Sequence, residues 1–490
     1  MPQDPHPSRL DDRSRWQAFG VCVAVAALTI LDLSKVNVGL PSIEDSLNAG
    51  PSELQSIVAG YALAFGLVLV PAGRLGDIHS RRILFLVGLS AFTLTSLACA
   101  LAPDVNTLIV GRFLQGIAAG IQMPQVLGLT QQLFQGPERG RAFGLFGSII
   151  GISTAFGPTL GGLLIGVGGE ENGWRLLFWM NIPLGVILLF FAARLLPRLQ
   201  GRGDQPRDLD PIGVILLGAG VLCFMLPFVL TTGGPDDDPR RWFWLVGAAV
   251  LGTAFVAWER RYQSQGRSPA VRFTLFRRAS YRNGLLIATV YFAALPATFL
   301  LTTLFLQEGL GLSPLEAGLT TVPFALTSAI TAYIGGRLVD TWGRALVVIG
   351  ITIVIVGFGL DVLAAVLAPP ELAPWLMAAA LALTGAGGGF VVSPNQTLTL
   401  AEVPVSEGGV AGSMAQVGQR VGTAVGVAAA SSTFFATLYA ESDDPNVLEV
   451  YHDSFRNGIL VAVALIAVAL VLGLLDQRQR RRGAAADAEA

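Results

Sequence analysis

The chain has very little lysine and little charge of either sign. Of its 32 lysine and arginine residues only one, Lys35, is a lysine, and charged residues make up 13% of the 490. A phosphate-binding loop needs a Gly-Lys-Ser/Thr sequence, and the single lysine stands elsewhere, inside an apolar stretch. The sequence therefore excludes an ATP-driven pump built within this chain.

Histidine and cysteine are equally scarce, with three of each. No pair of histidines has the H-E-x-x-H spacing, and no nucleophile stands beside a base, so we expect neither an enzyme nor a metal site. The three cysteines fall within apolar segments, where cysteine behaves as a small apolar residue. An intramembrane histidine relay is excluded because the histidines lie in expected tails or loops: His6, His79 and His452.

Apolar residues, at 52%, and 58 glycines dominate the composition and indicate a polytopic membrane protein. The apolar runs are long rather than alternating, which favours helices of about 20 residues over barrel strands. Fourteen such segments are predicted, at 17–41, 53–73, 83–102, 107–132, 142–167, 175–196, 209–231, 241–260, 282–307, 314–336, 345–368, 374–399, 408–438 and 456–476.

The distribution of basic residues predicts the orientation. With both termini in the cytoplasm, 25 basic residues lie inside and only Arg175, Arg240, Arg241 and Arg456 lie outside, as the positive-inside rule requires. We therefore expect a multi-pass protein of the cell membrane with both termini cytoplasmic. No short apolar core with a cleavage site begins the chain, so the first helix is expected to remain as an anchor.

Two short turns reveal an internal repeat. Residues 73–81 (GRLGDIHSR) match residues 336–344 (GRLVDTWGR) at an offset of 263 residues. The repeat predicts an N-terminal six-helix bundle at 17–196 and a C-terminal six-helix bundle at 282–476. Residues 197–281 then hold linkers and two inserted helices, and 477–490 form a cytoplasmic tail.

Four sequence patterns resemble those of the major facilitator superfamily, specifically its fourteen-helix drug:proton antiporter branch. The first-helix pattern matches at Leu31, Asp32, Val36, Asn37, Val38, Leu40 and Pro41. The turn pattern matches at Gly73, Leu75, Asp77, Arg81 and Arg82. The fourth- and fifth-helix patterns match at Arg112, Gln115 and Gly116 and at Gly157, Pro158, Gly161 and Gly162.

This resemblance, which covers essentially the whole chain, implies the all-α major facilitator fold and a function. We expect a proton-coupled secondary exporter of lipophilic small molecules, such as drugs or antibiotics, that works by alternating access. The proton gradient is the energy source and no cofactor is expected. The expected partners are the substrate, protons and the lipid bilayer, without nucleic acid, and the protein is expected to be a monomer. An exporter of lipids or endogenous metabolites is an open alternative, and a membrane enzyme or sensor is a more remote one.

Proton coupling is expected at Asp32, Lys35 and Arg112. Asp32 and Lys35 stand three residues apart and share a helix face, and an ionisable group at this depth needs a partner or a function. Arg112 enters from the outer side on an antiparallel helix, so the three charges can occupy one layer. Desolvation favours the neutral acid and an adjacent cation favours the carboxylate, so movement of a cation would switch the proton on Asp32. A fixed buried ion pair is the alternative.

Lys35 departs from the resembling family, which usually has an apolar residue there. Two hypotheses follow: Lys35 is a built-in counter-ion for Asp32, or it is a cavity cation that biases substrate choice. Lys35, Arg112 and Arg420 outnumber Asp32 and Asp361 at membrane depth, which favours neutral or anionic substrates. Arg420 is expected either to bind substrate or a carboxylate or to bond backbone carbonyls, and Asp361 is expected to be structural.

Three further groups of residues complete the expected machinery. The helix with the antiporter pattern, Gly157, Pro158, Gly161 and Gly162, is expected to pack closely and to bend. A conformational latch is expected at the turns, where an Asp opening a helix and an Arg bridging to the other half hold the outward-facing state: Asp77, Arg81, Arg82, Asp340 and Arg344. The substrate cavity is expected to be lined by Asn37, Tyr61, Gln115, Gln122, Gln125, Tyr291, Asn395, Gln396 and Arg420.

Overall fold

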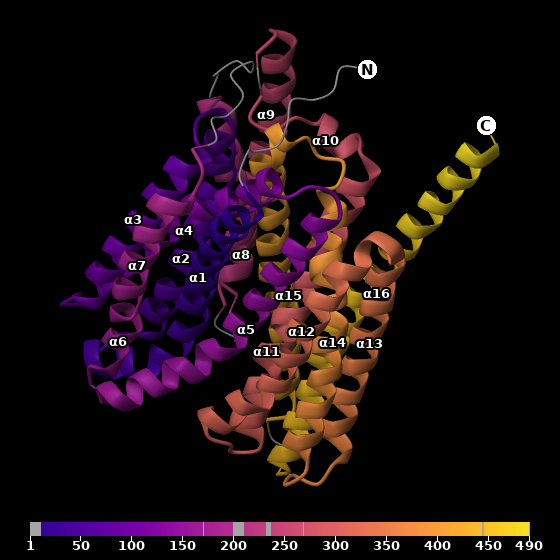
Figure 1. The fold of residues 1–490 in the computed structure, drawn as a ribbon. Coiled ribbons are helices and arrows are strands. Elements are labelled where there is room, and N and C mark those ends of the chain that lie inside the picture. Colours follow the sequence, from indigo (N-terminus) through magenta and orange to yellow (C-terminus); the bar gives the residue numbers. More distant parts are fainter. Residues whose placement is uncertain are drawn as a thin grey trace.

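The computed structural model of this chain describes residues 11–169, 171–198, 210–231, 237–267, 269–442 and 445–489, and within them all regular structure is helical (Figure 1). The α-helices are α1 (Asp12–Leu47), α2 (Pro51–Ile78), α3 (Arg81–Ala100), α4 (Val105–Leu133), α5 (Gly136–Gly168), α6 (Gly173–Trp179), α7 (Asn181–Leu195), α8 (Pro211–Val229), α9 (Trp244–Ser264), α10 (Thr274–Arg277), α11 (Ala279–Leu304), α12 (Pro314–Trp342), α13 (Arg344–Leu367), α14 (Ala373–Thr399), α15 (Gly408–Ala440) and α16 (Val447–Glu489). Three short elements are the 3₁₀ turns η1 (Pro239–Phe243) and η3 (Val405–Glu407) and the π-helical turn η2 (Phe305–Gly309).

Twelve helical segments in the described ranges are long and apolar enough to cross a membrane, and the bent helix α5 is a thirteenth. Together, α6 and α7 make one such segment, Gly173–Leu195. Helix α4 is not among them; it carries Arg112 and several glutamines, yet it packs against α2 and α3. The structure therefore confirms an all-helical membrane protein with about twelve apolar spans.

The helices form two groups that lie side by side in Figure 1, one coloured indigo to magenta and the other orange to yellow. In the first group α2 and α3 pack on α4, and α1 packs on α5 and α7. In the second group α12 and α13 pack on α14, and α11 packs on α15 and α16. The same pairings recur at the offset that the two repeated turns predict.

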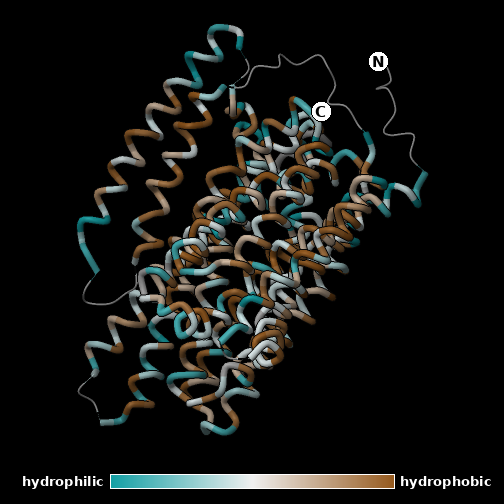
Figure 2. The backbone as a smooth tube through the Cα atoms, turned by 90° about the vertical axis from the view of Figure 1, so that its left-hand side faces the viewer, coloured by the Kyte–Doolittle hydropathy of each residue, from teal (hydrophilic) through white to brown (hydrophobic). Residues whose placement is uncertain are grey.

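Helices α8 and α9 pack on each other beside these groups. Helix α8 also contacts α2 and α15. The carboxylate of Asp210 accepts the backbone N–H of Gly213 at 2.8 Å, which caps α8, and the indole N–H of Trp258 at 2.9 Å, which ties α9 to it. The predicted linkers around these helices fall partly outside the described residues. In Figure 2, hydrophobic stretches fill the middle of the outer helices and hydrophilic residues gather at their ends, as in a membrane band.

Local sequence explains where several helices begin. Ser313 and Glu316 form a capping box at the start of α12, and proline stands in its first turn. Asp104 caps α4 by accepting the backbone N–H of Thr107 at 2.9 Å. This bond, together with one from the Thr107 hydroxyl, holds the pKa of Asp104 below its ordinary value.

The structure adds detail at two predicted boundaries. The span predicted at 175–196 matches the apolar segment Gly173–Leu195, whose helix is divided at Met180, where α6 ends and α7 begins. The tail predicted from residue 477 continues the last helix, because α16 extends to Glu489. The residues after Asp476 are mostly Arg, Gln and Ala, which are good helix formers, so the helix does not stop where the apolar run stops.

Candidate functional site

The three charges predicted at membrane depth meet inside the first group of helices. Arg112 of α4 donates to Asp32 of α1, with 2.7 Å between Nη1 and Oδ2. The ammonium nitrogen of Lys35 lies 3.7 Å from the other carboxylate oxygen of Asp32. All three side chains are fully buried. A buried carboxylate is thus held between two cations on two helices.

Asn181, at the start of α7, completes the cluster and was not predicted. Its amide nitrogen donates to Asp32 Oδ1 at 2.6 Å, and its amide oxygen accepts the Lys35 ammonium at 2.6 Å. Asn181 also contacts Ser96 of α3 at 3.2 Å. The direct bond of Lys35 is therefore to Asn181, which stands between Lys35 and the carboxylate. A neutral amide in an apolar stretch gave no sequence signal of this role.

Gln115 and Ser96 close the network on the side of α3. Arg112 donates to the Gln115 amide oxygen at 2.8 Å, and the Gln115 amide nitrogen donates to the Ser96 hydroxyl at 2.8 Å. Gln115 is fully buried, so it belongs to the charge cluster rather than to a wall of an open cavity. These hydrogen bonds between buried side chains hold α1, α3, α4 and α7 in a single arrangement, although Nε of Arg112 has no partner among the described residues.

The side chains around Asp32 are all hydrogen-bond donors. Arg112, Lys35 and the amide nitrogen of Asn181 can only donate hydrogen bonds, and they occupy both carboxylate oxygens. The carboxylate of Asp32 is therefore surrounded by donors from α1, α4 and α7.

Aromatic rings continue the cluster toward the second group of helices. The Arg112 guanidinium lies over the Tyr61 ring, 4.2 Å from its centroid, and Tyr61 stacks on Phe65 at 6.3 Å. Arg420 of α15 lies over the Phe65 ring at 4.7 Å. The buried Tyr61 hydroxyl has no hydrogen-bond partner in the described part of the chain. The two arginines, one from each group, thus face successive rings of α2.

The glycines predicted on helix five pack against Lys35. A Cβ added at Gly161 would lie 2.9 Å from the carbonyl oxygen of Lys35, and one added at Gly157 would collide with Ser34. At Gly162 an added Cβ would meet nothing within 4 Å. The helix bends by 43° between Glu138–Thr154 and Thr159–Gly168, a junction whose sequence includes Pro158. The side chain of Pro158 lies outside the described residues.

The bend divides α5 into two parts with different neighbours. Before it, Gly140 and Gly144 approach Gly336 of α12, and the Ser148 hydroxyl donates to the Ala329 carbonyl at 2.6 Å. Beyond it, the helix packs on α1 of its own group. The contacts of α5 with the second group therefore come from its first part. In Figure 1 the two groups of helices diverge toward the end of the molecule at which α5 ends.

The first predicted latch turn joins the two groups of helices. Asp77 pairs with Arg81 at 2.6 Å and accepts the backbone N–H groups of Gly409 and Val410, at 3.1 and 2.9 Å. Arg81 donates to the carbonyl of Val405 at 2.8 Å. The prediction that Asp77 opens its own helix was wrong, because Asp77 lies at the end of α2. It caps the start of α15, 332 residues away, where the helix dipole favours a carboxylate.

The second predicted latch turn makes its bonds differently. Arg344 is buried and pairs with Asp476 of α16 at 2.5 Å, and it also donates to Asn395 of α14. These bonds stay within the second group of helices. Asp340 is exposed, and Arg82 donates to the Ala193 carbonyl within the first group. Of the five residues predicted for the latch, Asp77 and Arg81 form hydrogen bonds across the junction, and Asp340 of α12 lies near enough to Arg139 of α5 to attract its charge.

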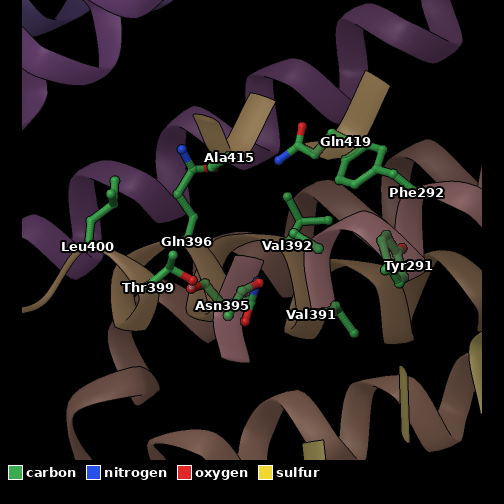
Figure 3. A pocket seen from close by; sticks show the side chains of 12 residues that line it. Tyr291, Phe292, Val391, Val392, Asn395, Gln396, Thr399, Leu400, Ala415 and Gln419 are labelled. Carbon is green, nitrogen blue, oxygen red and sulfur yellow. Dashed lines mark hydrogen bonds between the residues drawn. The ribbon is translucent and has the colours of Figure 1, made fainter. Parts of the chain in front are cut away.

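A small cavity lies among α11, α14 and α15 and includes predicted cavity residues. Its volume is about 20 Å³, room for about one water molecule rather than for a drug-sized ligand. In Figure 3 the side chains of Gln396 and Gln419 extend to one side of this cavity and Asn395 to the other. Asn395 donates to the Gly284 carbonyl at 2.9 Å and accepts from Arg344, so its polar atoms are engaged within the second group. Tyr291 also lines the cavity.

The remaining predicted cavity residues are dispersed. Gln122 donates to the Thr29 hydroxyl at 2.7 Å and Gln125 to the Ala72 carbonyl at 2.9 Å, and both are fully buried. Asn37 is exposed. Asp361, which was expected to be structural, is buried in α13. Its one hydrogen bond in the described part of the chain comes from the Thr302 hydroxyl at 3.4 Å. The structure therefore gathers one compact cluster around Asp32 and places these other residues outside it.

Comparisons with known proteins agree with this architecture. The family model described as Major Facilitator Superfamily matches residues 22–427 and, in a second match, residues 284–490. A probable actinorhodin transporter of Streptomyces coelicolor is 34% identical over 432 residues, covering 87% of this chain and 74% of that protein. The multidrug resistance protein Stp of Mycobacterium tuberculosis is 30% identical over 440 residues, covering 89% of this chain and 79% of that protein.

Solved structures show the same fold at low sequence identity. The human organic anion transporter MFSD10 superposes with a TM-score of 0.64 at 14% identity, covering 92% of this chain and 99% of that one. Its likeness concerns the fold alone. From the family match along most of the chain, the two repeated groups of helices and these relatives, it follows that the chain belongs to the Major Facilitator Superfamily of membrane transporters.

Proposed function

We propose that this protein is a proton-driven exporter of lipophilic small molecules, antibiotics among them, and that it works by alternating access. The observation that carries the proposal is the buried carboxylate of Asp32, held by Arg112 and Asn181 and facing Lys35. The names of the relatives, a probable actinorhodin transporter and a multidrug resistance protein, support the substrate class.

Asp32 is the proposed proton carrier. In the described arrangement both of its oxygens accept hydrogen bonds, and Arg112 leaves it before a proton takes the place of the cation. Arg112 also contacts the ring of Tyr61, so a substrate that packs on this ring holds the guanidinium against Asp32 and competes with the proton. Substrate binding and proton binding are thereby linked through one arginine. The proton gradient supplies the energy, about 2.3 kcal/mol for each charge that crosses 100 mV, and no cofactor takes part.

Lys35 is proposed to act as a built-in counter-ion. It is fully buried and bonded to Asn181, which supports this role over that of a cation facing the cavity. When Arg112 moves away, Lys35 and Asn181 remain beside the carboxylate. The carboxylate of Asp32 thus keeps a cation beside it when Arg112 moves. This avoids the cost of leaving a buried charge unpaired.

The latch is proposed to close the cytoplasmic side. The bonds from Asp77 and Arg81 to η3 and α15 join the two groups of helices at one end, which supports an outward-facing arrangement.

We also propose that α4, which packs against α2 and α3, is the fourteenth span. Fourteen spans put both termini on one side, and the arginine excess makes that side the cytoplasm of a cell-membrane protein. The cluster is complete within one chain, which supports a monomer.

A transport measurement on the full chain tests this function. Liposomes with an internal pH dye would receive the purified protein and a panel of aromatic antibiotics that begins with actinorhodin. We expect a substrate to evoke proton flux in the wild type and none with Asp32→Asn. The matched control is Asp361→Asn, which removes a buried carboxylate outside the cluster and should keep the flux. Flux that persists in Asp32→Asn would remove this carboxylate from the coupling step.

A further inference from the structure

Arg420 is a cation at membrane depth with no protein counter-charge. It makes no ion pair and no hydrogen bond to another described residue, and its recorded contact is with the Phe65 ring. Both other membrane-depth cations, Lys35 and Arg112, have Asp32. A charge at membrane depth without a partner is expensive, and natural proteins keep one where a function requires it. Among the described residues, Arg420 has no acidic partner.

No carboxylate is available to it from the neighbouring helices either. Helix α15 packs on α2, α4, α8, α11 and α16. Between the ends of these helices, at 54–73, 106–132, 211–229, 283–307 and 457–475, Arg112 is the one charged residue. The carboxylate of Asp32 on α1 is already occupied by Arg112 and Asn181. The described neighbours therefore leave Arg420 without a counter-charge, which an anionic ligand can supply.

Arg420 faces the junction between the two groups of helices. It stands seven residues after Ser413, which shares its face of α15, and that face meets Gly73 of α2. The opposite face, with Gly418 and Gly422, packs on α11. Arg420 lies deep in the protein yet is only half-buried, so its accessible surface belongs to the interior space between the groups.

The groups near Arg420 suit an aromatic ligand. Phe65 offers a ring face to Arg420, and Tyr61, whose buried hydroxyl has no hydrogen-bond partner among the described residues, stacks on Phe65. A guanidinium binds carboxylate, sulfonate or phenolate oxygens through paired N–H donors, and its flat faces stack on rings. We infer that Arg420 is the anion-binding residue of the transport path and that it selects planar aromatic anions.

This inference rests on the proposed export function for its biological meaning, but its test is a binding measurement without a gradient. The probes are 1-anilinonaphthalene-8-sulfonate and N-phenyl-1-naphthylamine, which share a skeleton and differ by the sulfonate. Their affinities are measured by fluorescence on the full chain in nanodiscs, for the wild type and for Arg420→Gln and Arg420→Lys. Loss of proton coupling would leave this binding intact, so a failure of either proposal can be recognised.

The expected result separates the two probes. Arg420→Gln should weaken binding of the sulfonate by about tenfold or more, as loss of a charge-assisted hydrogen bond implies, and change that of the neutral probe by less than about twofold. Arg420→Lys should retain most of the sulfonate affinity. The matched control is Arg337→Gln, because Arg337 also lies over a ring, that of Tyr333, but is exposed. It should change neither affinity.

Unchanged sulfonate binding in Arg420→Gln, or equal weakening of both probes, would overturn the inference. If Arg420→Gln does not fold, the wild type provides the decisive measurement. Phenylglyoxal should then modify Arg420, as read by mass spectrometry, and the sulfonate but not the neutral probe should protect it. Modification at the same rate with and without the sulfonate would contradict the inference.

Discussion

At the scale of single residues, Asn181 decides how the charges of the cluster are arranged. It accepts from Lys35 and donates to Asp32, each at 2.6 Å, in a site without solvent exposure. Without this amide the two charges on α1 would face each other at 3.7 Å, with their remaining hydrogen-bonding capacity unused. A neutral residue therefore lets a lysine stay beside the coupling carboxylate.

Replacing Asn181 by Ala should be destabilising. The change leaves the Lys35 ammonium and one oxygen of Asp32 short of a partner in a buried site, which costs about 1 to 3 kcal/mol. The melting temperature of the full chain in detergent, followed by tryptophan fluorescence, should fall. The control is Asn37→Ala, because Asn37 is exposed on the same helix as Asp32 and its loss should shift the melting temperature little. Equal melting temperatures for Asn181→Ala and the wild type would contradict the role given to Asn181.

The sequence revealed the charged members of this cluster and not the neutral ones. Asp32, Lys35 and Arg112 stand out because an ionisable residue in an apolar run is rare. Asn181 and Ser96 are common polar residues in membrane helices, and their importance depends on which helices meet. The partners of Asp77 were hidden for a related reason, because Gly409 and Val410 act through backbone N–H groups that any residue carries.

At the scale of elements, α5 is the helix that connects the two groups of helices with the charge cluster. Its first part packs on α12 and α14, and the part beyond the bend packs on Lys35 of α1. Small residues permit both approaches. The glycine pattern indicated close packing in advance, but the pattern could not say that the packed partner is the backbone beside the coupling site.

Gly161→Ala and Gly162→Ala should behave differently. A Cβ at Gly161 would sit 2.9 Å from the Lys35 carbonyl oxygen, tighter than ordinary contact, so α1 and α5 must separate. We expect substrate-evoked proton flux in liposomes to fall by about tenfold or more for Gly161→Ala, since small displacements near a reacting group have effects of that size. At Gly162 an added Cβ meets nothing within 4 Å, so flux should be unchanged. Similar losses in both variants would indicate a general effect on the helix.

Sequence periodicity predicted the elements well and their ends less well. Long apolar runs mark the buried length of a helix, whereas α1 begins at Asp12 and α16 ends at Glu489, beyond those runs. For α4, hydropathy misses a whole helix. Arg112 and the glutamines of α4 lower its mean hydropathy, so it is not recognised as an apolar span.

At the scale of the whole molecule, the two repeated turns have diverged. The first joins the two groups of helices through Asp77 and Arg81, whereas Arg344 in the second binds Asp476 within its own group. The repeat in the sequence predicted equivalent roles. The difference arises because α16 carries Asp476 beside Arg344, whereas Arg81 pairs with Asp77 of its own turn.

The latch should therefore be sensitive at one turn only. Asp77→Asn removes the ion pair with Arg81 and weakens the cap of α15, which should open this end of the molecule. Spin labels at the exposed positions Ile83 and Trp342, one in each group, should report a longer and broader distance distribution. Asp340→Asn, the repeat counterpart, removes an attraction to Arg139 of α5 but no hydrogen bond, and it should change the distribution much less than Asp77→Asn. Opening by Asp340→Asn as well would indicate two equivalent latches.

The central claim is that substrate binding and the proton on Asp32 are linked through Arg112. The most direct measurement is proton release from the purified full chain in weakly buffered detergent, monitored with a pH dye as a substrate found in the liposome screen is added. The wild type should release protons, because substrate and proton compete for the cluster, and Asp32→Asn should release none while still binding. Equal release from both proteins would show that the proton resides elsewhere.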